Sequence, residues 1–273
     1  MPMKTCNGAE LYYELSGDGA PLVLVHGGWI DAKSWELVVP AFAEHFQVLS
    51  YDRRGHSRSR RPGAGSRRHD EDDLIALLDA LDLTPAHLVG NSFGAAIVLA
   101  VAGRRPDLVR SVVAHEPPLV GVATAGSPLA ALTDPVLATL SELVDLVRIG
   151  ARERAARRFV EEIALGPGSW PMLTEEIRQT MITNAATLIP QFDDPDWAVV
   201  PAPTVVPTLL THGELSPAWL PAITRELAAT TYRHAGRHTF TGAGHVPHLT
   251  HAAEHAQVAM TFAATASLVT VDL

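Results

Sequence analysis

The chain has 273 residues, of which 47% are hydrophobic, and its formal net charge is −9. This composition allows a single domain with a large buried core, and the negative charge argues against a nucleic-acid partner. The single cysteine, Cys6, excludes an internal disulfide, and no apolar run approaches the ~20 residues that a membrane-spanning helix needs. With a polar N-terminal segment, these features predict a cytoplasmic protein that has no membrane partner.

Segments that predict strands alternate with segments that predict helices in the first part of the chain. Strands are expected over residues 10–15, which alternate as an edge hairpin strand does, and then over 21–25, 46–52, a segment beginning at 86, and 108–114. Helices are expected over residues 32–44 and 70–83 and directly after residue 92. This alternation is typical of a parallel sheet that is covered by helices.

The alternation stops after Glu116, where the pattern becomes helical. Amphipathic helices are expected over 129–149, 152–165 and 174–188. Strand and helix patterns then return, with strands over 207–213 and 237–240 and helices over 217–229 and 252–266. The sequence therefore predicts a core domain made of residues 1–116 and 201–273, with residues 117–200 inserted as a helical cap.

The segment Gly90-Asn91-Ser92-Phe93-Gly94 carries the clearest catalytic pattern. A serine at a sharp strand-to-helix turn crowds its neighbours, so small residues must stand two positions before and after it. The first amides of the following helix then face any negative charge that develops beside the serine oxygen. The pattern predicts Ser92 as a nucleophile, although a glycine-serine-glycine segment by itself is equally compatible with a plain turn.

Two further glycine-rich segments support the catalytic interpretation. His26-Gly27-Gly28-Trp29 ends an earlier strand, at the sheet edge where sites of parallel sheets form. The amide of Gly28 can pair with that of Phe93 as an oxyanion hole. Gly242-Ala243-Gly244-His245 places His245 on a loop after the last strand, as a general base requires. The alternative for the first segment is a glycine turn beside a packing tryptophan.

A metal site at His245, His248 and His251 is the alternative for the histidines. The triplet lacks a carboxylate at a recognised spacing, and the chain has no His-Glu-x-x-His motif. We therefore expect neither a metal nor an organic cofactor.

These segments, together with Tyr51-Asp52-Arg53-Arg54-Gly55-His56-Ser57, resemble the motifs of the α/β-hydrolase fold family, in the same order and at strand ends. The resemblance covers essentially the full chain. It implies an α/β fold with a mostly parallel central sheet, a serine nucleophile, a histidine base, an acid, and a helical cap over the site.

The acid departs from the family pattern. Most members have an aspartate three residues after a strand that ends in glycine, and here that position, after Gly213, is Ser216. A hydroxyl cannot stabilise an imidazolium as a carboxylate does. The candidates are Glu116, which follows the strand after the nucleophile helix, and Glu214. Glu116 is favoured because it closes an apolar strand at the same sheet edge as Ser92, and because the arrangement resembles certain haloalkane dehalogenases and resorcylic-lactone hydrolases. Another carboxylate, or none, is the remaining alternative.

For the remaining candidate residues, structural roles are expected more than catalytic ones. Asp52 resembles a structural residue of the family loop. The arginines between residues 53 and 68 are expected on a solvated loop, with contact to an anionic substrate as the alternative. An apolar pocket is expected to include a set of large side chains: Trp29, Phe93, Trp170, Met172 and Trp219.

The sequence as a whole predicts a serine hydrolase that cleaves an ester or lactone bond of a small-to-medium hydrophobic substrate. Ser92, His245 and Glu116 would form its triad. One alternative is a carbon–carbon bond hydrolase of ring-fission products, because the sequence around Ser92 also resembles those enzymes. The other alternative is a non-catalytic ligand-binding member of the family. Either a monomer or a homodimer is compatible with the sequence.

Overall fold

The computed structural model describes residues 2–59 and 65–268. Its centre is one sheet, formed among these residues by eight strands. The strands are β1 (Met3–Cys6), β2 (Ala9–Ser16), β3 (Ala20–Val25), β4 (Phe46–Tyr51), β5 (Ala86–Asn91), β6 (Val109–His115), β7 (Thr208–Gly213) and β8 (Gly236–Phe240).

The strands lie in the order β1-β2-β4-β3-β5-β6-β7-β8. The β1–β2 and β2–β4 pairs are antiparallel, and every other pair is parallel. The strand predicted over residues 10–15 is β2, and it is not the edge, because β1 pairs with its outer side. The parallel strands direct their carboxyl ends toward one edge of the sheet.

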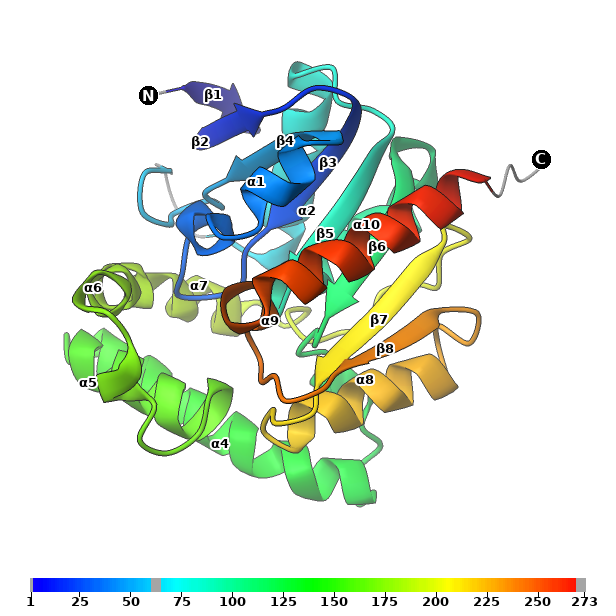
Figure 1. Ribbon diagram of the computed structural model, residues 1–273. Coiled ribbons are helices and arrows are strands. Elements are labelled where there is room, and N and C mark those ends of the chain that lie inside the picture. Colours follow the sequence, from blue (N-terminus) through cyan, green and yellow to red (C-terminus); the bar gives the residue numbers. More distant parts are fainter. Residues whose placement is uncertain (1, 60–64, 269–273) are drawn as a thin grey trace.

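Helices cover both faces of the sheet (Figure 1). Their bounds are α1 (Val39–Ala43), α2 (Arg67–Ala80), α3 (Phe93–Arg104), α4 (Pro128–Arg148), α5 (Arg152–Arg158), α6 (Glu175–Asn184), α7 (Leu188–Asp193), α8 (Trp219–Ala229), α9 (Pro247–Thr250) and α10 (Ala252–Leu268). The helix predicted over residues 32–44 is divided into a 3-10 turn, Ala32–Trp35, and α1. Pro40 lacks an N–H, so it is tolerated only in the first turn of α1.

The period of two along each strand determines which face each side chain covers. In β3, Leu22 and Leu24 pack in a cluster with side chains of α1 and α10. Val23 and Val25 pack in a larger cluster with side chains of α2, α3 and α8. A parallel strand that is buried on both faces reads as a continuous apolar run, which explains why residues 21–25 were recognisable.

The helices α4 to α7 lie beyond the carboxyl edge of the sheet (Figure 1). Their buried side chains, such as Leu143 and Leu188, belong to the same apolar cluster as Val25 and Trp29. Asn184 of α6 accepts a hydrogen bond from the amide of Ser57 at 2.8 Å, which ties these helices to the loop after β4. No helix of residues 2–59 and 65–268 is long and apolar enough to span a membrane.

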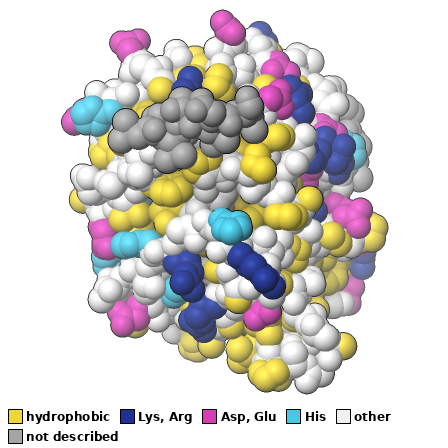
Figure 2. Space-filling view, turned by 90° about the vertical axis from the view of Figure 1, so that its right-hand side faces the viewer, with side chains coloured by type: hydrophobic (Ala, Val, Ile, Leu, Met, Phe, Trp, Pro, Cys, Tyr) yellow, Lys and Arg dark blue, Asp and Glu magenta, His cyan; other side chains and the backbone are white. Residues whose placement is uncertain are grey.

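The prediction of solvated arginines is wrong for Arg53 and Arg54 in the loop after β4, whereas Arg68 is exposed as expected. Arg53 and Arg54 are 2% and 7% exposed, and they form ion pairs with Asp70 and Asp73 of α2. The prediction failed because the acidic side chains at the start of α2 face inward and partner the arginines. Arg60 and Arg61, in the same predicted loop, lie outside the described residues. Acidic and basic side chains are interspersed over the face shown in Figure 2.

Several histidine rings are buried and held neutral around the sheet. Burial lowers the pKa of His87 to about 4 and that of His255 to about 3. Burial also lowers the pKa values of His26, His56 and His248 well below their usual value of 6.5. The unfolded chain therefore binds more protons than the folded one below about pH 6.5, and the folded state loses stability as the pH falls.

We expect the free energy of unfolding to be several kcal/mol lower at about pH 5.5 than at about pH 7.5. Each such histidine contributes up to about 1.4 kcal/mol per pH unit below its unfolded pKa. Urea unfolding at the two pH values measures the difference. His255→Phe should reduce it, because the ring stacks on Phe240 and a phenyl ring takes up no proton. Equal stability at the two pH values would contradict this account.

Candidate active site

Ser92 lies at the turn between β5 and α3, with φ 54° and ψ −121°. The turn requires glycine on both sides. A Cβ atom on Gly94 would lie 2.1 Å from the carbonyl oxygen of Val25, and one on Gly90 would lie 2.5 Å from that of Gly94. Ser92 is one of few non-glycine residues with positive φ in the described chain. The backbone is therefore held in a sparsely populated conformation, as expected of a nucleophile at such a turn.

Ser92 is anchored to the neighbouring strand and helix. Its amide donates a hydrogen bond to the carbonyl oxygen of His115 at the end of β6, at 2.8 Å. Its own carbonyl oxygen accepts from the amide of Ala95 at 2.9 Å, in the first turn of α3. The amide of Phe93 is thus one of the first donors of α3, which leaves it available to an anion beside Ser92.

His245 lies on the loop after β8, and two hydrogen bonds and one close backbone approach hold this loop. The side-chain amide of Asn91 donates to the carbonyl oxygen of His245 at 3.0 Å. The amide of Leu215 donates to the carbonyl oxygen of Ala243 at 2.8 Å. At Gly213, a Cβ atom would lie 2.5 Å from the carbonyl oxygen of Gly244. The end of β7 therefore fits closely under the loop that carries the histidine.

Glu116 is the carboxylate that contacts the His245 ring. One carboxylate oxygen, Oε2, lies 2.6 Å from Nδ1 of His245, and the other, Oε1, accepts from the amide of Gly213 at 2.9 Å. The side chain is completely buried, and the residue has φ 47°. Positive φ at a glutamate is strained, and the amide hydrogen bond to Thr211 at 3.0 Å helps to hold it.

A second histidine faces the same carboxylate. Nε2 of His115 lies 3.5 Å from Oε2 of Glu116, while its Nδ1 is hydrogen-bonded to the hydroxyl of Thr211 at 2.9 Å. Burial by itself raises the pKa of the Glu116 carboxyl, but the neighbouring His115 and His245 rings outweigh it and lower the pKa below its usual range. Glu116 therefore stays ionised at neutral pH.

Neither of the two other candidates for the acid position is hydrogen-bonded to the His245 ring. Glu214 is exposed, and its Oε2 accepts from the amide of Gly242 at 2.8 Å. The hydroxyl of Ser216 is buried and has no hydrogen-bond partner among the described residues. The carboxylate that is hydrogen-bonded to the His245 ring is therefore Glu116.

Ser92 and His245 line one cavity, whose helical side is formed by residues of α4, α7, α8 and the segment Phe159–Ala164. Of the predicted pocket residues, Trp29, Phe93 and Trp219 line it. Its lining consists of Gly28, Trp29, Ser92, Phe93, Pro118, Val120, Leu140, Phe159, Ile163, Ala164, Leu188, Gln191, Trp197, Trp219 and His245. The rings of Trp29 and Phe159 are stacked at 4.8 Å, which joins the sheet side of the cavity to the helical side.

Trp170 and Met172 do not line this cavity, so their assignment to the pocket was wrong. Trp170 is buried in the packing of the helical segment, and the side chain of Met172 is 83% exposed. Both belong to one 3-10 turn, Trp170–Met172, which follows the breaker sequence Gly166-Pro167-Gly168. Both are large apolar residue types, which is why they were expected in a pocket. Whether their side chains reach the cavity depends on the direction of the turn.

The sequence did not predict a role for Asn91, His115 or most of the cavity lining, including Gln191. Asn91 and His115 directly precede Ser92 and Glu116, so their proximity to the predicted residues was the available signal. Gln191 of α7 had none. Its side-chain oxygen faces Gly28, since a Cβ atom on Gly28 would lie 3.9 Å from it.

The histidines considered for a metal are not brought together as a set of ligands. His248 is buried beside Trp35 and His255, whereas His251 is hydrogen-bonded to the hydroxyl of Thr250. Within residues 2–59 and 65–268, the group with metal-like spacing is His115, Glu116 and His245. There, Nδ1 of His245 and Oε2 of Glu116 are engaged with each other.

Comparison with known proteins shows that this chain is similar to hydrolases. The model of the alpha/beta hydrolase family matches residues 22–258. The 2-hydroxymuconate semialdehyde hydrolase of Pseudomonas sp. (strain CF600) is 30% identical over 92% of this chain and 89% of its own length. An uncharacterized hydrolase, YraK, of Bacillus subtilis (strain 168) is 38% identical, but over only 41% of this chain and 43% of its own. Among solved structures, the enol-lactonase of Burkholderia xenovorans LB400 superposes with a TM-score of 0.80, at 25% identity, over 96% of this chain and 99% of its own.

Proposed function

Because this chain belongs to the α/β hydrolase family and has its fold, as the sequence predicted, we propose that it is a serine hydrolase that cleaves an ester or lactone bond. The proposal rests on one observation above the others. A buried, ionised carboxylate contacts Nδ1 of His245, and this histidine lines the same apolar cavity as Ser92. A serine and a histidine positioned by an acid at one cavity constitute the arrangement that acyl transfer needs.

In the proposed acylation step, Nε2 of His245 takes the proton of the Ser92 hydroxyl while Oγ bonds to the substrate carbonyl carbon. The carbonyl oxygen becomes an oxyanion, which the amides of Gly28 and Phe93 stabilise. When the tetrahedral species collapses, the bond to the leaving oxygen breaks and this oxygen takes the proton from His245. Glu116 holds the Nδ1 proton and offsets the charge of the imidazolium.

Deacylation repeats these steps with water as the nucleophile. His245 takes a proton from the water, whose oxygen bonds to the acyl carbon, and the same two amides stabilise the second oxyanion. Collapse releases the carboxylic acid and returns the proton to Oγ of Ser92. For a lactone, the leaving oxygen remains attached to the acyl group, so the product is a single hydroxy acid.

The lining of the cavity supports a hydrophobic, uncharged substrate. Its polar side chains, apart from the indole nitrogens, are Ser92, Gln191 and His245, and no charged side chain occurs among the described lining residues. A buried carboxylate on a substrate would need a charged or multiply hydrogen-bonded partner there. Stacked and indole rings favour flat or branched apolar groups of small to medium size.

A carbon–carbon bond hydrolase is the second candidate. The observation that favours it is the 30% identity to the 2-hydroxymuconate semialdehyde hydrolase over most of both chains. We place it second because the substrates of such an enzyme carry an acidic group, for which the described cavity lining offers no cationic side chain.

A substrate panel distinguishes the two candidates. We expect turnover of p-nitrophenyl acetate, p-nitrophenyl butyrate and uncharged lactones, with kcat/KM for the uncharged esters at least about 10-fold above that for a vinylogous diketo acid. The measurement is initial rates at equal enzyme concentration, followed by absorbance or pH change. Faster cleavage of the diketo acid would reverse the order of the two candidates, and no turnover of any ester or lactone would refute the proposed activity.

A further inference from the structure

We infer that Arg53 is a positioning residue that holds both donors of the oxyanion hole. This inference rests on the proposed function, because it concerns how the amides of Gly28 and Phe93 are oriented. Arg53 lies two residues after β4 and does not line the cavity with Ser92 and His245. Arg53 therefore acts on the site through the residues that line the cavity.

The first contact is with the peptide that supplies the Gly28 amide. Nη1 of Arg53 donates to the carbonyl oxygen of Gly27 at 3.1 Å. This oxygen and the N–H of Gly28 belong to the same planar peptide unit, so fixing the oxygen also fixes the direction of the N–H. A charged donor on the oxygen in addition polarises the unit, which strengthens the hydrogen bond that its N–H can donate.

The second contact is with the residue that supplies the other amide. The guanidinium carbon of Arg53 lies 4.7 Å from the centre of the Phe93 ring, within the range of a cation–π interaction. Phe93 is 2% exposed and begins α3, so a fixed ring restrains the first residue of that helix. A single guanidinium therefore touches both segments whose amides would face the oxyanion.

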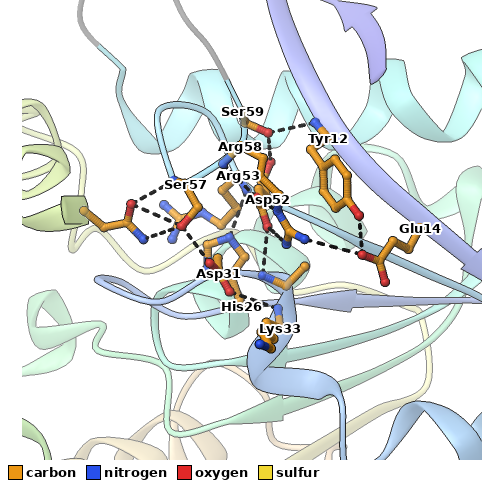
Figure 3. A network of polar contacts seen from close by, with 12 residues as sticks. Tyr12, Glu14, His26, Asp31, Lys33, Asp52, Arg53, Ser57, Arg58 and Ser59 are labelled. Carbon is orange, nitrogen blue, oxygen red and sulfur yellow. Dashed lines mark hydrogen bonds and ion pairs between the residues drawn. The ribbon is translucent and has the colours of Figure 1, made fainter. Parts of the chain in front are cut away.

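The backbone of Arg53 adds a third link to the same loop. Its amide donates to Nε2 of His26 at 2.9 Å, and Nδ1 of His26 is 2.7 Å from the carbonyl oxygen of Gly27. Nε2 must be unprotonated to accept, so Nδ1 carries the proton and donates to Gly27. Figure 3 shows Arg53 and His26 within the polar network around Asp52. The carbonyl oxygen of Gly27 is thus held by both the side chain and the neighbouring ring.

Burying an isolated cation is unfavourable, but Asp70 compensates the buried charge of Arg53. Nη2 of Arg53 is 2.7 Å from Oδ2 of Asp70, and the two side chains are 2% and 10% exposed. A buried pair of this kind contributes little net stability, because desolvation offsets the attraction. A fixed positive charge beside the oxyanion loop, however, also favours the negative charge that develops in the transition state.

Arg54 provides a matched control for Arg53. It is 7% exposed, and its Nε donates to Oδ2 of Asp73 at 2.7 Å, so it forms the same kind of buried pair with the same helix, α2. The other described partner of its side chain is the carbonyl oxygen of Asn7, in the turn between β1 and β2. The two arginines thus share burial and charge but differ in contact with Gly27 and Phe93.

The test compares Arg53→Lys with Arg54→Lys. For each variant, kcat and KM are measured with p-nitrophenyl butyrate, and the inhibition constant is measured for phenylboronic acid. The boronic acid accepts Oγ of Ser92 on boron while the serine proton passes to His245, which gives a tetrahedral, negatively charged adduct. Loss of a complete oxyanion donor costs about 10²–10³-fold in kcat. For misaligned donors we expect kcat to fall about 10- to 100-fold in Arg53→Lys, with phenylboronic acid weakened by a similar factor and KM changed less than about 3-fold. Arg54→Lys should retain kcat within about 3-fold.

Equal losses in the two lysine variants would overturn the inference, whereas an inactive wild-type protein would refute the proposed function instead. If Arg53→Lys does not fold, Asp70→Asn and Asp73→Asn replace the pair, since each keeps its arginine and a hydrogen-bond acceptor. Asp70→Asn should lower kcat and weaken the boronate more than Asp73→Asn does, and the reverse or equal losses would again overturn the inference.

Discussion

Replacing Ser92 by alanine is expected to lower kcat for ester hydrolysis by at least about 10⁴-fold, since the nucleophile and the covalent route are both lost. The residual rate would come from direct attack of water on the bound ester, with the oxyanion donors still in place. KM should change little, because the methyl group of alanine fits where the serine side chain stood. Stopped assays with p-nitrophenyl butyrate, with freshly purified enzyme at high concentration, measure the remaining rate.

Ser216→Ala is the control for this substitution. It removes another serine hydroxyl, one that is buried and has no hydrogen-bond partner among the described residues. Deleting such a group is nearly neutral or slightly stabilising, so kcat should remain within about 3-fold of the wild-type value. Full esterase activity in Ser92→Ala would refute the assignment of the nucleophile.

Glu116→Gln is expected to lower kcat by about 10⁴-fold, the effect seen when the acid of a serine triad is replaced by its amide. The amide has the same shape but cannot offset the imidazolium charge, and its NH₂ group can hold the ring in the wrong tautomer. The loss should persist from about pH 6 to about pH 8, because the lowered pKa keeps the wild-type carboxylate ionised over this range. Rate profiles over these pH values provide the measurement.

Glu214→Gln is the matched control, since it makes the same change of charge two residues from the usual acid position. Glu214 contacts the amide of Gly242 and lies on the protein surface, so its replacement should leave kcat within about 3-fold. Comparable losses in both variants would mean that the negative charge near the loop matters more than the contact with the His245 ring. A loss confined to Glu214→Gln would move the acid role to that residue.

Much of the fold was predictable because it depends on patterns that are local in sequence. Runs such as Pro21–Val25 are buried on both sheet faces and therefore read as continuous apolar strands. The turn around Ser92 was recognisable because glycine is required at residues 90 and 94, where any Cβ atom would collide with backbone. Glu116 was a candidate because it follows a strand, and parallel strands end at one edge of the sheet.

The features that were missed depend on which way side chains point after the chain folds. Arg53 and Arg54 were expected on a solvated loop, yet Asp70 and Asp73 of α2 face inward and pair with them. Met172 has the composition of a pocket residue but is directed to solvent. Gln191 reaches the oxyanion loop from α7, a contact across more than 160 positions that no local pattern encodes.

Covalent labelling with a fluorophosphonate tests most directly whether Ser92 is activated by His245 and Glu116. The second-order rate constant is followed by intact mass, and the labelled position is identified by peptide mapping. We predict one adduct, on Ser92, formed equally fast in the wild-type protein and Glu214→Gln and at least about 10²-fold more slowly in Glu116→Gln. Labelling of Glu116→Gln at the wild-type rate, or no adduct on Ser92 of the wild-type protein, would contradict the proposed triad.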